Sequence, residues 1–215
     1  PNWHLTSGIR YDHYSDFGDT FNPRVALVWE TTDQVTSKFL YGRAFRAPSF
    51  SELYSTNPVA FGNPNLTPQT LDSYELAINV RPSAHLQYGV NLFHYDAKDI
   101  ILYRRDDQQF YSPFNEGRQK AYGGELELSY TLASNLSLSA NYSYVTIDGT
   151  SKPSEAGNAP KHQAHVQANW SFAPEWQLVP QISYVGERAH DKGHKHSAFD
   201  DYVLVNLALQ RRNLL

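Results

Sequence analysis

The chain has no cysteine, no long apolar run and little excess charge of either sign. Without cysteine it has no thiolate metal site, no redox pair and no cysteine nucleophile. A net charge of −4 over 215 residues gives no bias toward nucleic acid, so no nucleic-acid partner is expected. The mean hydropathy is −0.56, and no apolar run approaches the roughly 20 residues of a spanning helix. A transmembrane β-barrel is compatible with this low mean hydropathy, because its strands alternate lipid-facing and lumen-facing residues.

Catalytic signatures are also missing. The sequence contains no G-x-S-x-G, H-E-x-x-H, P-loop or dinucleotide-binding glycine pattern, so we expect no enzyme. The opening residues Pro1 to Leu5 lack the basic stretch and apolar core of a signal peptide, and the last residues follow directly on a strand-like run. We therefore expect both ends to be cuts, and residues 1–215 to be a single segment of one domain.

Alternation with a period of two is the dominant pattern and predicts an all-β chain of about ten strands. In the clearest segment Leu126, Leu128 and Tyr130 interleave with Glu127 and Ser129. Across the segments the polar set is mostly Ser, Asn, Gln and Thr, which is typical of a wet barrel lumen. In the segment from 86 to 102, His94 and Asp96 stand at positions of the alternation that are otherwise apolar. A bulge or the barrel rim would explain them.

Connections alternate between short and long. Tight turns are predicted at 31–34, 81–84, 133–135 and 173–175, and long polar loops at 16–22, 48–67, 105–117, 148–160 and 189–201. Short turns on one rim and long loops on the other distinguish outer-membrane barrels, whose periplasmic turns are short.

Aromatic residues add a third indication of a barrel. One band lies on apolar faces beside the short turns, and a second lies on the same faces near the long loops. Two such bands match the aromatic girdles at the two headgroup levels of a membrane. The first band is Trp3, Trp29, Tyr88, Tyr130, Trp170, Phe172 and Trp176, and the second is Tyr11, Tyr74, Tyr144 and Tyr184.

Two motifs resemble signatures of the TonB-dependent receptors. The run Phe45-Arg46-Ala47-Pro48-Ser49, followed by Glu52-Leu53-Tyr54, resembles their F-R-A-P-S and E-L-Y pattern. After a loop, Asn63-Pro64-Asn65-Leu66-Thr67-Pro68 resembles their N-P-x-L-x-P element, although Gln69 replaces the acidic residue usual after that proline. The resemblance covers nearly the whole chain.

The resemblance implies an antiparallel transmembrane β-barrel segment, about ten strands of a 22-stranded barrel, in the outer membrane of a Gram-negative bacterium. It implies energised uptake of a scarce ligand, with a ferric siderophore as the leading candidate and haem or cobalamin as others. No intrinsic cofactor is expected, and the transported ligand would be a small-molecule chelate that carries iron. Outer-membrane lipid is an expected partner, and so is the TonB complex, which would be contacted through an N-terminal region that this chain lacks.

Candidate ligand-binding residues lie in and around the two motifs. Charged candidates for an anionic chelate are Arg43, Arg46 and Glu52, which would equally brace the barrel rim. Aromatic candidates for stacking on a planar ligand are Tyr54, Phe61, Phe110 and Tyr111, which would equally pack one loop against another.

A histidine cluster is the candidate metal site. His190, His194 and His196 lie in the last predicted loop, near Asp191, Asp200 and Asp201. Imidazoles at this spacing reach one metal ion if the loop folds around it, and otherwise belong to an ordinary polar loop.

Two other functions fit parts of the pattern. A passive porin or adhesin barrel would share the strands, turns and girdles. A soluble all-β carbohydrate-binding domain would share only the alternation.

Overall fold

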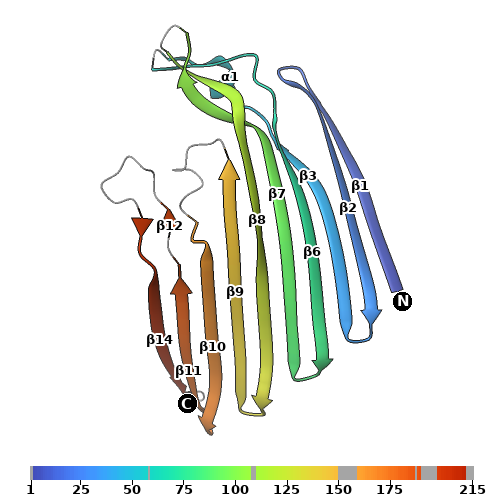
Figure 1. The fold of residues 1–215 in the computed structure, drawn as a ribbon, viewed down its shortest axis with the longest axis vertical. Helices are drawn as coiled ribbons and strands as arrows, with labels where there is room; N and C mark the ends of the chain where they lie inside the picture. The colour runs from blue at the N-terminus through green and yellow to red at the C-terminus, as the bar shows by residue number, and fades with distance from the viewer. Residues whose placement is uncertain are drawn as a thin grey trace.

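The computed structural model describes residues 2–57, 59–107, 110–149, 159–186, 188–189 and 198–211. Within these ranges ten strands form one antiparallel sheet (Figure 1). They follow one another in the sheet in sequence order, and four two-residue strands form two separate small hairpins. The all-β prediction of about ten strands is confirmed. The ten strands are β1 (Asn2–Tyr14), β2 (Gly18–Thr32), β3 (Val35–Arg46), β6 (Gln69–Ser83), β7 (Leu86–Arg105), β8 (Tyr111–Ala133), β9 (Leu136–Gly149), β10 (His162–Ala173), β11 (Trp176–Val185) and β14 (Tyr202–Arg211).

Small elements lie in two connections at one end of the sheet. Helix α1 (Phe50–Tyr54) and the hairpin of β4 (Thr56–Asn57) and β5 (Ala60–Phe61) lie between β3 and β6, and β12 (Arg188–Ala189) pairs with β13 (Ala198–Phe199) between β11 and β14. Among the described residues no helix is long and apolar enough to cross a membrane.

The four predicted tight turns and the predicted long loop at 48–67 are confirmed, whereas the loops predicted at 148–160 and 189–201 lie largely outside the described residues. At one end, two-residue turns join β2 to β3, β6 to β7, β8 to β9 and β10 to β11. At the other end lie the connections from β1 to β2, from β3 to β6 and from β7 to β8, together with α1 (Figure 1). The predicted loops at 16–22 and 105–117 are shorter than expected, because β2 already begins at Gly18 and β7 and β8 extend through most of the second range.

Register places the alternating residues on two distinct faces. Trp3 pairs with Trp29, Tyr41 with Tyr74, and Leu76 with Leu92, so these side chains share one side of the sheet, here called the apolar face. Both predicted aromatic bands lie on this face. The opposite polar face carries residues such as Asn79, Gln87 and Ser139, together with a hydrogen-bonded row from Gln181 through Gln167 to Asn169.

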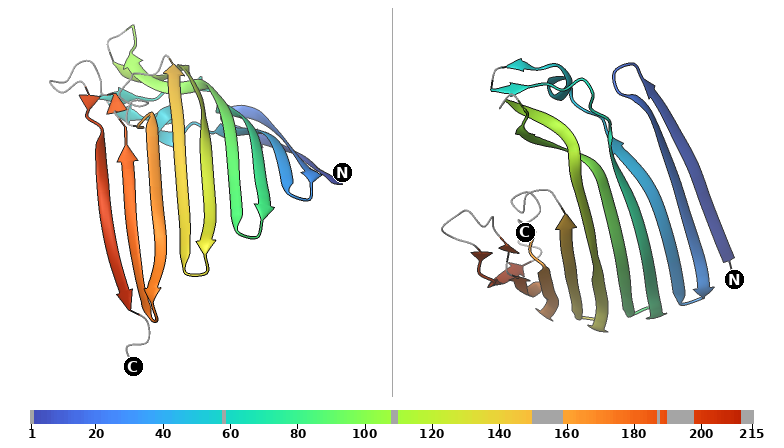
Figure 2. Two further views of the ribbon diagram at one scale, coloured as in Figure 1. Left: turned by 60° about the horizontal axis from the view of Figure 1, so that its bottom comes forward. Right: turned by 45° about the horizontal axis from the view of Figure 1, so that its top comes forward.

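The chain keeps its large apolar side chains exposed. Leu5 is 68% and Val205 71% exposed, and among the described residues the buried apolar cluster contains only Leu53, Leu66 and Ile101, packed against Phe17. The sheet also curves: in the right view of Figure 2, β10, β11 and β14 are seen nearly end-on while the earlier strands run along the page. A curved sheet with one continuous apolar face suits a barrel wall surrounded by lipid.

Candidate functional site

Helix α1 begins at a capping box inside the first motif. The Ser49 hydroxyl accepts a hydrogen bond from the Glu52 backbone N–H at 3.2 Å, and the Glu52 carboxylate accepts one from the Ser49 N–H at 2.7 Å. These reciprocal bonds satisfy two donors that a helix start leaves open. Arg46, at the end of β3, donates two further bonds to Glu52 at 2.9 and 3.1 Å. The motif therefore fixes the direction in which the chain leaves the barrel wall.

The charge of Glu52 is stabilised by this arrangement. Partial burial raises the pKa of the Glu52 carboxyl, but the hydrogen bonds from Arg46 and Ser49 outweigh burial, so the pKa lies below its ordinary value. Glu52 is thus an anion at neutral pH that holds helix and strand together.

The second motif folds back onto α1. Asn63 donates from its backbone to the Glu52 carbonyl at 2.8 Å, and its side chain donates to the Pro113 carbonyl of β8 at 3.0 Å. Leu66 is 2% exposed and packs in the small core beside Leu53. Residues 50–67, here called the loop cap, are therefore attached to β8 by the motif residues themselves.

Asn115 is a second attachment point for the loop cap. Its side-chain oxygen accepts from the Thr67 N–H at 2.8 Å, and its amide donates to the carbonyls of Thr67 and Asp99 at 2.9 and 2.7 Å. The motif could be read from the sequence, but this partner could not, because it lies 48 residues away.

The aromatic candidates gather at this end in separate contacts. Phe61 and Phe110 meet edge to face at 4.9 Å, which brings β5 of the loop cap to the segment before β8. Tyr54 contacts Phe50 at 5.0 Å, and the Arg105 guanidinium lies 5.6 Å from the Tyr111 ring. Tyr54, Phe110 and Tyr111 are each about two-fifths exposed, so part of each ring is open to a ligand.

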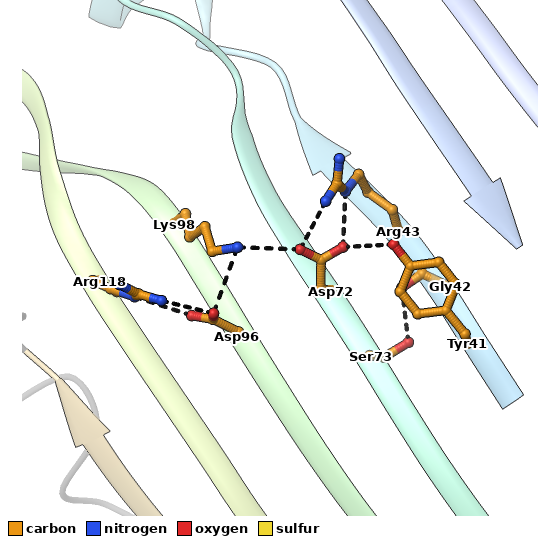
Figure 3. A network of polar contacts seen from close by, with 8 residues as sticks. All are labelled: Tyr41, Gly42, Arg43, Asp72, Ser73, Asp96, Lys98 and Arg118. Carbon is orange, nitrogen blue, oxygen red and sulfur yellow. Dashed lines mark hydrogen bonds and ion pairs between the residues drawn. The ribbon is translucent and has the colours of Figure 1, made fainter.

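Arg43 occupies a different place from the other candidates. It points to the apolar face, whereas Arg46 is an odd number of residues along the same strand and points to the polar face. Arg43 donates to Asp72 of β6 at 2.8 and 3.0 Å, and the Tyr41 hydroxyl donates to the same carboxylate at 3.0 Å (Figure 3).

The Arg43 pair is one end of a network across four strands that the sequence reading missed. Lys98 lies 3.4 Å from Asp72 and 3.5 Å from Asp96, and Arg118 donates to Asp96 at 2.9 Å (Figure 3). We call Arg43, Asp72, Asp96, Lys98 and Arg118 the rim cluster. In the sequence this cluster is indicated by Asp96, a charged residue at an otherwise apolar position of the alternation. The pairing of β6 with β7 continues without a register shift through Ala97, so the barrel rim, rather than a bulge, explains that charge.

The predicted metal site cannot be placed on the structure. His190, His194 and His196 all lie outside the described residues. Within the described part of the chain, no group of three or more His, Asp or Glu side chains is placed to hold a metal ion.

The polar face carries carboxylates as well as amides. Glu75 accepts a hydrogen bond from the Tyr95 hydroxyl at 3.3 Å, and Glu127 lines a hollow nearer the short turns. This hollow is lined further by Asn79, Gln87, Ser129, Ser139 and Asn141.

These features define a class of protein: a wall segment of a membrane-spanning β-barrel, with short turns at one rim and folded loops at the other. The family model for TonB dependent receptor-like β-barrels matches residues 1–212. The chain belongs to this family of outer-membrane receptors, which are not enzymes and have no intrinsic cofactor. Membership overturns the soluble carbohydrate-binding alternative.

Individual relatives agree with the family. The chain is 27% identical to an iron-regulated outer membrane virulence protein of Vibrio cholerae over 93% of this chain and 33% of that protein. It is 24% identical to the vitamin B12 transporter BtuB of Photobacterium profundum over 96% of this chain and 34% of that protein. The chain thus spans about a third of the length of these curated relatives.

A solved structure shares the fold. A mutant of the ferric enterobactin receptor PfeA of Pseudomonas aeruginosa, in complex with enterobactin, superposes with a TM-score of 0.83 at 23% identity. The match covers 99% of this chain and 36% of that receptor.

Proposed function

We propose that the intact protein imports a scarce ligand across the outer membrane with energy supplied through the TonB complex, and that the ligand is a ferric siderophore. Residues 1–215 would contribute one segment of the barrel domain of that receptor. Family membership supports uptake, and an iron-regulated protein and a ferric enterobactin receptor are among the relatives. Haem and a cobalamin remain the competing ligands, the latter because BtuB is also a relative.

The observation that carries the siderophore proposal is the aromatic and cationic surface at the long-loop end. Phe61 and Phe110 form an edge contact with the second ring 39% exposed, and Tyr111 lies beside the Arg105 guanidinium. Half-exposed rings stack on planar aromatic groups, and neighbouring arginines attract anionic chelates. A catecholate ferric chelate combines both properties.

The charged motif residues have a supporting part in this proposal. Arg46 and Glu52 are committed to each other and to the start of α1, so they set the position of the loop cap. Arg43 is committed to Asp72 on the apolar face. We therefore assign ligand contact to Tyr54, Phe61, Phe110 and Tyr111, and positioning to Arg46 and Glu52.

Growth of a deletion strain under iron limitation tests the function. Complementation with the intact receptor should restore growth on one ferric siderophore from a panel that also includes haem, and it should restore cobalamin use only if cobalamin is the ligand. The double variant Phe61→Ala/Phe110→Ala should reduce growth on that siderophore, whereas Phe93→Ala, on the polar face of β7, should not. Equal growth of the deletion strain and the complemented strain on every ligand would contradict import and favour a passive barrel or adhesin.

A further inference from the structure

The rim cluster lies at a defined height on the apolar face. Arg43 and Asp72 pair directly with each other, one alternation step beyond the pair of Tyr41 and Tyr74. Tyr74 belongs to the aromatic band on the long-loop side, and such bands lie at the headgroup level of a membrane. Beyond that band, the next outward-pointing side chains meet lipid headgroups on the extracellular side.

The cluster presents its cations and covers its anions. The side chains of Asp72 and Asp96 are 5% and 13% exposed, whereas those of Arg43, Lys98 and Arg118 are 35%, 41% and 54% exposed. The carboxylates thus lie beneath the ammonium and guanidinium groups. A headgroup that approaches this face from the lipid side meets positive charge.

Lys98 and Lys120 add positive charge beyond what holding the strands together requires. Each carboxylate already has an arginine partner at 2.8 or 2.9 Å, and Lys98 adds only longer contacts of 3.4 and 3.5 Å. Lys120 of β8 is also exposed on this face, opposite Asp96 on one neighbouring strand and Asp148 on the other. Even with Asp148 included, the four cations outnumber the three carboxylates.

We infer that the rim cluster and Lys120 bind the phosphate of a lipid headgroup in the outer leaflet of the outer membrane. Arginine offers a planar fork of donors to phosphate, and lysine adds a compact charge. Basic side chains just outside the apolar part of a membrane protein attract anionic headgroups in this way. The inference does not depend on which ligand the receptor transports, because the site faces away from the lumen.

The test measures lipid binding to the intact receptor in neutral detergent by native mass spectrometry. The probe is diphosphoryl lipid A, and the matched probe is the same lipid without its phosphates. The variant Lys98→Gln/Lys120→Gln removes two exposed charges while Asp72 keeps Arg43 and Asp96 keeps Arg118, so the strands stay braced. The control variant Arg24→Gln/Lys38→Gln removes two cations from the polar face of β2 and β3.

A lysine near a charged lipid surface contributes a factor of about five in affinity, so we expect the double variant to bind diphosphoryl lipid A about 25-fold more weakly. The control variant and Lys98→Arg/Lys120→Arg should bind as the unchanged receptor does. Raised salt should weaken binding to the unchanged receptor, which tests the inference even if the glutamine variant fails to fold. Equal affinity of the glutamine variant, or equal binding of the phosphate-free lipid, would overturn the inference and leave the cluster a strand brace.

Discussion

Glu52 combines two interactions that substitution can separate. Glutamine preserves the capping acceptor of Ser49 and removes the charge that pairs with Arg46, whereas alanine removes both. We expect hydrogen exchange in the loop cap of the intact receptor to accelerate modestly in Glu52→Gln and more strongly in Glu52→Ala. A lost capping interaction costs about 1 kcal/mol of local stability. Identical exchange in both variants would show that the capping hydrogen bond adds nothing to the charge of Glu52.

The lowered pKa of Glu52 gives the loop cap a pH dependence of definite sign. Because the folded-state pKa lies below the unfolded value of about 4.3, the charge stabilises the loop cap above that pH. This contribution declines as the pH falls through the folded-state pKa. Protection of residues 50–67 from exchange, corrected for the intrinsic rate, should therefore fall on acidification. The same measurement on Glu52→Gln should lose this component, and an unchanged pH profile would contradict the assignment.

Asp72 is the residue on which the rim cluster depends most. Its side chain is 5% exposed and accepts hydrogen bonds from Tyr41, Arg43 and Lys98. In Asp72→Asn one amide oxygen remains to serve these donors, so we expect the intact receptor to lose about 1–3 kcal/mol of stability in detergent. Chemical denaturation monitored by tryptophan fluorescence measures the loss.

The exposed pair of Arg104 and Glu116 provides the control for Asp72. Its side chains are 44% and 49% exposed, and pairs of this kind contribute little to stability. Glu116→Gln should leave the denaturation midpoint unchanged. If it lowers the midpoint as much as Asp72→Asn does, burial is not what makes the rim cluster matter.

At the scale of elements, the turn between the two motifs depends on a glycine that no other residue can replace. A Cβ on Gly62 would lie 2.5 Å from the Ser55 nitrogen and 2.6 Å from the Leu53 carbonyl oxygen. Gly62→Ala should therefore open the loop cap and make it sensitive to protease added to intact cells. Gly42→Ala, where the nearest atom is the Ser73 hydroxyl at 3.5 Å, is the matched control and should resist protease as the unchanged receptor does.

The four hairpin turns were predictable from the sequence, whereas the length of the β7–β8 hairpin was not. Each turn interrupts a clear alternation, which gives a local signal. Between 100 and 115 the hairpin continues through pairs of mixed character, such as Leu102 with Phe114 and Arg104 with Ser112, and bulges near Ile100 shift the alternation. Strands outside the membrane need no apolar face. The apolar–polar alternation, which reflects lipid contact, therefore does not predict their pairing.

Pro180 shows how a sheet tolerates a residue that the alternation pattern cannot explain. It lies within β11, between β10 and β14, and pairs with Leu207. On the β10 side the pairs run to Gln167 with Gln181 and resume at Trp170 with Leu178. The missing N–H of proline thus coincides with a local interruption of one ladder, while the other ladder continues.

At the scale of the whole molecule, the candidate site divides into parts that the sequence could and could not reveal. The motifs identified the loop cap and its aromatic residues, because the residues that build a loop are neighbours in the chain. The rim cluster draws on β3, β6, β7 and β8, with up to 75 positions between its members. Only the register brings those charges onto one side of the sheet.

The outer strands of the sheet determine how residues 1–215 should behave when produced alone. Within the described residues, β1 and β14 each pair on one side only, and β14 is exposed throughout. An unpaired backbone group in lipid costs several kcal/mol, so an open edge of a dozen residues is not tolerated in a membrane. We expect the isolated chain to aggregate, or to remain protease-sensitive after refolding into detergent, while the intact receptor yields a resistant barrel. Recovery of a protease-resistant monomer from the isolated chain would show that β1 and β14 can pair with each other and close a smaller barrel.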